Sequence, residues 1–153
     1  LFLKNDHMRI IYIGADHGGW QLKEALKLFL TKANYQVEDL GNKKFQPQDD
    51  YPDFAAQVAR AVVKKKSATG LLVCHSGVGM CVAANKIKGA RAAVITDTVT
   101  AREAVEDVNL NVICLGQGHL NIKMAQKIIT AFLSAKFTQA RRHQRRINKI
   151  AKL

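Results

Sequence analysis

One short segment combines the residue types that proton-transfer chemistry requires. It follows the apolar run Leu71–Cys74, which is typical of a buried strand. In order, the segment reads Cys74, His75, Ser76, Gly77, Val78 and Gly79. The glycines let the backbone approach a ligand closely, and N–H groups at the start of a following helix favour a thiolate or another anion. The sulfur of Cys74 could therefore serve as a base or a nucleophile, or it could simply pack beneath the loop.

An acid and an imidazole stand in a similar place after another apolar run. Asp16 and His17 follow Ile10–Ile13 within the sequence GADHGG. Both side chains can hydrogen-bond ligand hydroxyls or assist proton transfer, although Asp16 could instead cap the next helix. The segment lacks the GxGxxG pattern, and the chain has no GxxxxGK[ST]. Nicotinamide, flavin and nucleoside triphosphate sites are therefore poorly supported.

Positive charge is concentrated near the C-terminus of a chain whose net charge is +12. Arg142 and Arg146 are four residues apart, so a helix would place both on one face, with His143 beside Arg142. Paired guanidinium groups suit phosphate oxygens, whereas a solvated tail or a weak nucleic-acid contact is the alternative. Only one aromatic residue, Phe137, is near this tail in the sequence, and this lack of interleaved aromatic residues argues against a surface that binds single-stranded nucleic acid. The run Lys64–Lys66 is interpreted as a solvated helix end.

Strand and helix patterns alternate along the chain. Strands are predicted over Ile10–Ile13, Tyr35–Leu40, Leu71–Cys74, Ala92–Ile95 and Asn111–Leu115. Helices are predicted over Trp20–Ala33, Pro52–Lys65, Gly77–Lys86, Thr98–Glu106, Ile122–Leu133 and Phe137–Lys152. This order indicates an α/β fold with a parallel sheet, in which ligands bind at the carboxyl ends of the strands. We expect one domain over residues 9–153 and a disordered extension over residues 1–8.

The cysteines indicate a reducing compartment. Cys74, Cys81 and Cys114 are odd in number and form no CxxC pair or zinc-type cluster, and the latter two lie in apolar stretches typical of packing residues. No signal peptide or membrane-length apolar run is visible in the sequence. We therefore expect a cytoplasmic protein that binds neither membranes nor nucleic acid.

Six sequence pieces together resemble one protein family. They are GADHGG (14–19), DYPDFA (50–55), GLLVCHSGVGM (70–80), AANKIKGARAA (83–93), NVICLG (111–116) and RRHQRRINKI (141–150). Their order and spacing are similar to those of ribose-5-phosphate isomerase B and of the two subunits of galactose-6-phosphate isomerase. The resemblance extends from about Arg9 to Lys149, which is nearly the whole chain.

The resemblance implies both an architecture and an activity. The fold would be a Rossmann-like three-layer sandwich with a five-stranded parallel sheet and an extended C-terminal helix. Homodimers would share active sites, with the pairing of dimers into tetramers left open.

The reaction would be an aldose–ketose isomerisation without metal or organic cofactor. Ribose 5-phosphate, a substrate of the pentose phosphate pathway, is the leading choice. The alternatives are a hexose 6-phosphate such as allose or galactose 6-phosphate, and a partner-dependent or non-catalytic subunit that binds a sugar phosphate.

The resemblance also implies residue roles. Cys74 would move a proton between C2 and C1 through an enediolate, with Ser76 shuttling the hydroxyl proton. The backbone from His75 to Gly79, including Gly77 and Val78, would stabilise the enediolate charge. Asp16 and His17 would contact the sugar. Arg142 and Arg146 would bind its phosphate, either within one chain or across the interface of a dimer, and His143 and Tyr51 are further candidates.

The sequence departs from the family pattern in three places, which involve four residues. His75 stands where the family commonly has Gly, Asp107 and Val108 replace a His-Asn pair that includes the ring-opening acid, and Gly118 replaces a phosphate-binding Arg. We therefore hypothesise that His75, His17 or Asp107 opens the sugar ring. The alternative is that His75 only fills space or points outward.

Overall fold

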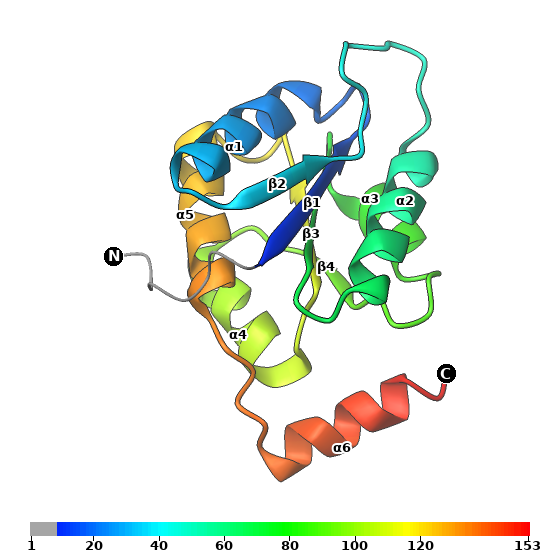
Figure 1. The fold of residues 1–153 in the computed structure, drawn as a ribbon, viewed down its shortest axis with the longest axis vertical. Helices are drawn as coiled ribbons and strands as arrows, with labels where there is room; N and C mark the ends of the chain where they lie inside the picture. The colour runs from blue at the N-terminus through cyan, green and yellow to red at the C-terminus, as the bar shows by residue number, and fades with distance from the viewer. Residues whose placement is uncertain (1–8) are drawn as a thin grey trace.

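The computed structural model describes residues 9–153, so the extension predicted over residues 1–8 lies outside the described residues. One sheet contains the parallel strands β1 (Ile10–Ala15), β2 (Gln36–Asp39), β3 (Thr69–Cys74), β4 (Ala92–Val94) and β5 (Val112–Gly116). The helices are α1 (Trp20–Lys32), α2 (Tyr51–Lys64), α3 (Val78–Ala84), α4 (Thr98–Val108), α5 (Ile122–Ser134) and α6 (Arg141–Ile150). This alternation confirms the predicted α/β fold (Figure 1).

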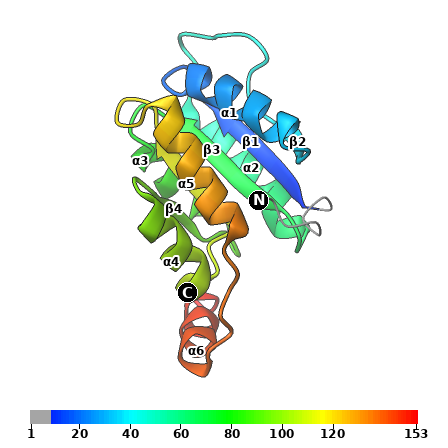
Figure 2. The same ribbon diagram turned by 90° about the vertical axis from the view of Figure 1, so that its left-hand side faces the viewer.

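Helices cover both faces of the sheet and bury two apolar clusters. Alternate residues of each strand point to opposite faces, so that Leu71 and Val73 of β3 face one cluster while Leu72 and Cys74 face the other. The first cluster includes residues of α1, α4 and α5, and the second includes residues of α2 and α3. Figure 2 shows α4 and α5 on the near side of the sheet. The arrangement is the expected three-layer sandwich.

The strand order creates a crevice beside the Cys74 segment. The order is β2-β1-β3-β5-β4, so the chain extends from β1 to β2 on one side and then returns to β3 on the other side of β1. At such a reversal the connections leave the strand ends in opposite directions and open a ligand crevice between them. The loops after β1 and β3, which carry Asp16 and Cys74, flank this point.

Close packing joins the first of these loops to β3. A Cβ atom at Gly19 would lie 2.4 Å from the carbonyl carbon and oxygen of Val73, far inside van der Waals contact. Glycine is therefore required where α1 begins, and its absent side chain lets the loop after β1 rest directly on the end of β3.

Two predicted helices are shorter than expected. The predicted helix Phe137–Lys152 begins only at Arg141, because the residues before it adopt another conformation. The backbone N–H and the hydroxyl of Thr138 both donate to the carbonyl of Glu106. Gln139 has a positive φ of 56°. The predicted helix Gly77–Lys86 begins after Gly77, whose φ of 81° is left-handed. Both helices are in the predicted places, but turns at their ends replace helical residues.

Helix α6 packs against α4 at the amino edge of the sheet. The end of α4 leads directly into β5, so this contact lies opposite the carboxyl ends that carry Cys74. Figure 1 shows α6 at this end of the molecule, beyond α4. None of the helices within residues 9–153 has the length and apolar character needed to cross a membrane.

Candidate functional site

The sulfur of Cys74 is held by the backbone of its own loop, residues 74–79, hereafter called the Cys74 loop. Cys74 ends β3 and is only 5% exposed, and the N–H of Gly77 donates to its Sγ at 3.0 Å. The left-handed conformation of Gly77 turns this N–H back toward the sulfur. The N–H of Val78 donates to Ser76 Oγ at 3.2 Å. A donor aimed at the sulfur stabilises negative charge there, so the geometry suits a thiolate base.

The loop after β5 is bonded to the Cys74 loop and fixes where His75 lies. The N–H of Gln117 donates to the carbonyl of Cys74 at 2.9 Å, and the N–H of Gly118 donates to the carbonyl of His75 at 2.8 Å. A Cβ atom at Gly118 would lie 2.4 Å from Cε1 of His75, so the imidazole occupies the space beside that glycine. The His119 ring lies 6.0 Å from the His75 ring, centroid to centroid.

Asp16 lies beside the crevice with an unused oxygen. The residue is 7% exposed, and its Oδ1 is buried without a hydrogen-bond partner among the described residues. Burial raises the pKa of Asp16, an effect that the neighbouring His17 partly offsets. Among the described residues no side chain caps α1, so Asp16 is not a helix cap, and its Oδ1 remains a buried acceptor without a partner there.

His17 is oriented by Asp49, which precedes α2. The backbone N–H of His17 donates to Asp49 Oδ1 at 2.8 Å, and Nδ1 of the imidazole lies 2.8 Å from the same oxygen. The hydrogen bond to Asp49 raises the pKa of His17 and leaves the opposite ring nitrogen for another partner. Ligand-type atoms of Asp16, His17 and Asp49 all lie within 4.8 Å of one another, but the His17–Asp49 hydrogen bond already accounts for this proximity.

Tyr51 also lies at the Cys74 loop. A Cβ atom at Gly79 would lie 2.8 Å from Cε2 and Cζ of the Tyr51 ring, so the ring covers this glycine. The first turn of α2 therefore contributes one wall of the candidate site.

The residues predicted at the C-terminus are not brought to Cys74 within one chain. Arg142 and Arg146 are exposed on α6, at the opposite edge of the sheet. His143 is buried: its Nδ1 lies 3.0 Å from Thr138 Oγ1 and 3.4 Å from Asp107 Oδ1. His143 and Asp107 therefore join α6 to α4, and these four residues could reach a Cys74 loop only on another copy of the chain.

The other two cysteines pack in the core as predicted. Cys114 is fully buried, and Cys81 is half-buried against the same cluster. A hydrogen bond with Cys114 lowers the pKa of Cys81 to about 7.

Sequence reasoning missed Asp49, Gln117 and His119. Asp49 belongs to an acidic stretch before a predicted helix, which is ordinary for a helix start and gave no sign of a contact with His17. Gln117 accepts a hydrogen bond from the N–H of Leu22 at 2.8 Å and so ties the loop after β5 to α1. Gln117 and His119 both follow β5 at the carboxyl edge of the sheet, and this position was the one feature of the sequence that could have marked them as site residues.

Comparison with known proteins identifies the family. Residues 11–150 match the Ribose/Galactose Isomerase family. The chain is 43% identical over 141 residues to the probable ribose-5-phosphate isomerase B of Mycoplasma genitalium, covering 92% of each chain. It is 35% identical to ribose-5-phosphate isomerase B of Mycobacterium tuberculosis, covering 92% of this chain and 87% of that protein.

A solved structure agrees in fold over the same span. The crystal structure of the Mycoplasma genitalium ribose-5-phosphate isomerase B with bound ribulose-5-phosphate has a TM-score of 0.91 and 42% identity, covering 95% of both chains. Sequence and fold therefore agree, and the chain belongs to the ribose/galactose isomerase family.

Proposed function

We propose that this chain is a ribose-5-phosphate isomerase that interconverts ribose 5-phosphate and ribulose 5-phosphate. The observation that carries the proposal is the hydrogen bond from the Gly77 N–H to Cys74 Sγ, placed at the crevice that also holds the unpartnered carboxylate oxygen of Asp16. Relatives that share most of the chain carry the same name, and one was solved with ribulose-5-phosphate bound.

In this reaction Cys74 acts as the base. The thiolate removes the proton from C2 of the open-chain aldose, and the electron pair moves to give an enediolate. The same proton then returns from the thiol to C1, which yields the ketose, while Ser76 relays a proton between the two sugar oxygens. The N–H groups of the loop stabilise the enediolate oxygen, and Asp16 accepts a hydrogen bond from a sugar hydroxyl.

Phosphate binding is assigned to the partner subunit of a homodimer. Arg142 and Arg146 are exposed on one face of α6 and lie far from the Cys74 loop of their own chain. A two-fold dimer would bring α6 of one subunit to the crevice of the other and complete two equivalent sites. We place the enzyme in the cytoplasm, since all three cysteines are free thiols in the structure and the substrate is a phosphorylated metabolite.

An isomerase assay of the purified protein tests the proposed reaction. We expect turnover of ribose 5-phosphate above that of allose 6-phosphate and galactose 6-phosphate. Cys74→Ala should reduce turnover by about 10²-fold or more, because it removes the base. Cys81→Ala is the matched control, since this half-buried thiol lies outside the crevice, and it should keep most of the activity.

Substantial activity in Cys74→Ala would refute the assigned base. Turnover of a hexose phosphate alone would retain the reaction and change the substrate. Sugar-phosphate binding without any turnover would instead favour a non-catalytic or partner-dependent subunit.

We further propose that His75 is the acid that opens the ribose ring. Its imidazole lies at the mouth of the site against Gly118, in the same chain as Cys74, whereas Asp107 pairs with His143 and could reach a Cys74 loop only on another copy of the chain. Ribose 5-phosphate is mostly cyclic, but ribulose 5-phosphate cannot form a five-membered ring through its phosphorylated C5 oxygen. Loss of the ring-opening acid should therefore lower kcat more in the forward than in the reverse direction, while the two kcat/KM values fall together because the equilibrium constant fixes their ratio.

The corresponding experiment measures both directions in His75→Gly, which restores the residue common in the family. We expect turnover of ribose 5-phosphate to fall by about tenfold or more, with a smaller change for ribulose 5-phosphate. Unchanged forward turnover would eliminate His75 from this role. His119→Gly is the control for the neighbouring imidazole, and we expect it to leave the ratio of the two directions unchanged.

A further inference from the structure

A large cavity lies at the edge of the sheet opposite Cys74. Its volume is about 1010 Å³, at the upper end of the range of small-molecule sites. The lining residues Arg9, Thr69, Arg91 and Asn111 stand at or just before the starts of β1, β3, β4 and β5, so the cavity opens at the amino edge. It is separate from the crevice assigned to the isomerase reaction.

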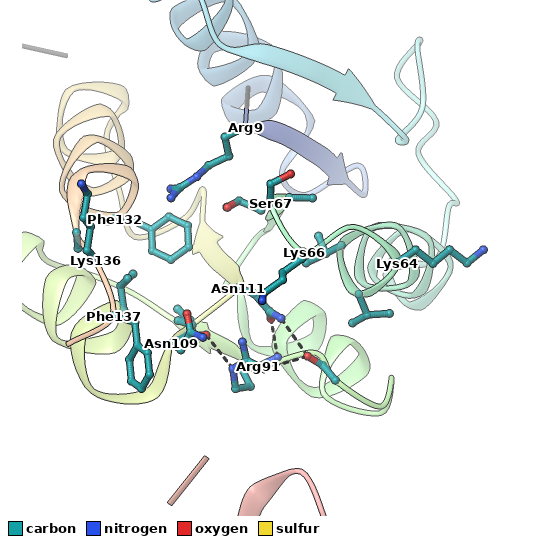
Figure 3. A pocket seen from close by; sticks show the side chains of 18 of the residues that line it. Arg9, Lys64, Lys66, Ser67, Arg91, Asn109, Asn111, Phe132, Lys136 and Phe137 are labelled. Atoms are coloured by element: carbon teal, nitrogen blue, oxygen red, sulfur yellow. Dashed lines mark hydrogen bonds between the residues drawn. The ribbon is translucent and has the colours of Figure 1, made fainter. Parts of the chain in front are cut away.

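The charged residues that line this cavity within residues 9–153 are all cationic. Among the described residues its lining contains no aspartate or glutamate, and its cations are Arg9, Lys64, Lys66, Lys88, Arg91 and Lys136. They come from several separate segments of the chain, so the charge is not a single basic run. Figure 3 shows Arg9 and Arg91 on opposite sides of the cavity and Lys64 directed away from it. Concave walls of one charge concentrate the field and attract an ion of opposite sign.

Two arginines are held in place by backbone carbonyls. Arg91 donates through Nε to the carbonyl of Asn109 at 2.8 Å and through Nη1 to the carbonyl of Gly89 at 3.3 Å. Arg9 donates through Nη1 to the carbonyl of Leu133 at 3.2 Å. Guanidinium groups fixed in this way lose little conformational freedom when they bind an anion.

Arg91 is half-buried, and no carboxylate in the described part of the chain pairs with it. No ion pair involves Arg91, Lys66, Lys88 or Lys136 within residues 9–153. Burial alone lowers the pKa of Arg91, with no acidic group contributing. A partly desolvated cation without a counter-charge gains more from an added anion than an exposed one does.

Apolar residues complete the cavity and indicate an organic ligand. Val63 and Phe137 lie among the lining residues, beside the cationic groups. Cations on opposite walls require anionic groups that are separated along the ligand, and apolar walls suit a hydrocarbon or aromatic portion. A single inorganic phosphate would use only part of these features.

We propose that the amino-edge cavity binds a small organic polyphosphate, of the size and chemistry of a nucleoside diphosphate, at a site separate from the isomerase crevice. Lys66, predicted from sequence to be part of a solvated helix end, contributes to this site together with Arg9, Arg91 and Lys136. The proposal does not depend on which sugar phosphate the isomerase crevice accepts.

Calorimetric titration of the full chain with ADP and with pyrophosphate tests this site. We expect saturable binding of both, with ADP tighter because of its apolar portion, and no competition from saturating ribose 5-phosphate. The double variant Lys66→Glu/Lys136→Glu should weaken binding by about tenfold or more, since two attractive charges become repulsive. Both lysines are exposed, so we expect the variant to fold.

The matched control is Lys32→Glu/Lys123→Glu, which makes the same charge change at exposed positions outside the cavity. It should bind ADP as the parent chain does, and both double variants should keep ribose 5-phosphate isomerase activity. Absence of saturable ADP binding, equal weakening in the two double variants, or displacement of ADP by ribose 5-phosphate would each overturn the proposal. Because activity is measured on the same samples, failure of this site is distinguishable from failure of the isomerase assignment.

Discussion

His75 and Gly118 lie on two neighbouring loops, and the large side chain of the first occupies the space left by the absent side chain of the second. Each is a departure from the family pattern when the sequence is considered alone, since the family commonly has Gly at the first position and Arg at the second. In the structure the imidazole of His75 fills the space next to Gly118, where a Cβ atom would lie 2.4 Å from Cε1. The two departures are therefore coupled by packing.

A double-mutant cycle measures this coupling. Gly118→Ala should destabilise the protein modestly, because the exposed imidazole must move aside, and the backbone of Gly118 itself does not have a left-handed φ. In a His75→Ala background the same substitution meets no ring. We expect a coupling free energy of about 0.5–1 kcal/mol from urea unfolding of the two single variants and the double variant. Strict additivity would contradict the packing argument.

At the residue scale the sequence predicted which side chains lie at the crevice better than it predicted the contacts that they make. The positions of Cys74, Asp16 and His17 at one crevice could be predicted because the carboxyl ends of parallel strands lie at one edge of a sheet. The partnership of His17 with Asp49 could not, since it joins residues 32 apart through the path of a loop. Tyr51 could be assigned to the site only from the family resemblance, and its contact with Gly79 became visible only in the structure.

A buried ion pair joins helix α1 to the end of strand β2. Lys23 is 0% exposed, and its Nζ lies 2.8 Å from Asp39 Oδ2 and 2.9 Å from the carbonyl of Asn42. Burial by itself would raise the pKa of Asp39, but hydrogen bonds from Lys23 and Lys27 outweigh it and hold the pKa below its usual value. The pair thus orients the polar connection that leads to Asp49.

We expect Lys23→Met to lower the free energy of unfolding by about 2 kcal/mol near neutral pH, since Lys27 remains as a partner for the buried carboxylate. A carboxyl group with a lowered pKa contributes stability above its unfolded pKa and loses it as pH falls through its folded pKa. The difference between parent and variant should therefore narrow in acid. Urea unfolding across the acidic range checks this, with Lys32→Met on the exposed face of the same helix as control. A difference that stays constant with pH would contradict the assignment.

At the scale of elements, apolar periodicity predicted every strand and helix that the structure contains. The errors lie at the ends of α3 and α6, where Gly77 and Gln139 adopt positive φ values. Turns of this kind depend on hydrogen bonds to distant backbone, such as the one from Thr138 to Glu106, which a local pattern does not contain.

For the whole molecule, the main question is whether α6 of one subunit completes the active site of another. If each site takes Cys74 from one subunit and Arg142 and Arg146 from the other, two inactive variants can restore activity together. We expect Cys74→Ala and Arg142→Gln/Arg146→Gln each to have little turnover alone. Coexpression should regain about a quarter of the parent activity, because half of the dimers are mixed and each mixed dimer holds one intact site.

The control coexpresses Cys74→Ala with Cys74→Ala/Arg142→Gln/Arg146→Gln, in which no subunit supplies the base. It should remain inactive. Absence of recovery in the first mixture, with mixed dimers demonstrated by differently tagged subunits, would place both arginines outside the shared site.

The position of α6, attached to α4 and remote from the Cys74 loop of its own chain, has a consequence for how the enzyme responds to dilution. A separated subunit would keep its sheet, its crevice and its thiol, yet it would lack the groups that hold the phosphate. Only the dimer would then be active, and the fraction of subunits in dimers would depend on protein concentration by mass action. Specific activity would decline with protein concentration while the circular dichroism of each chain stayed nearly constant.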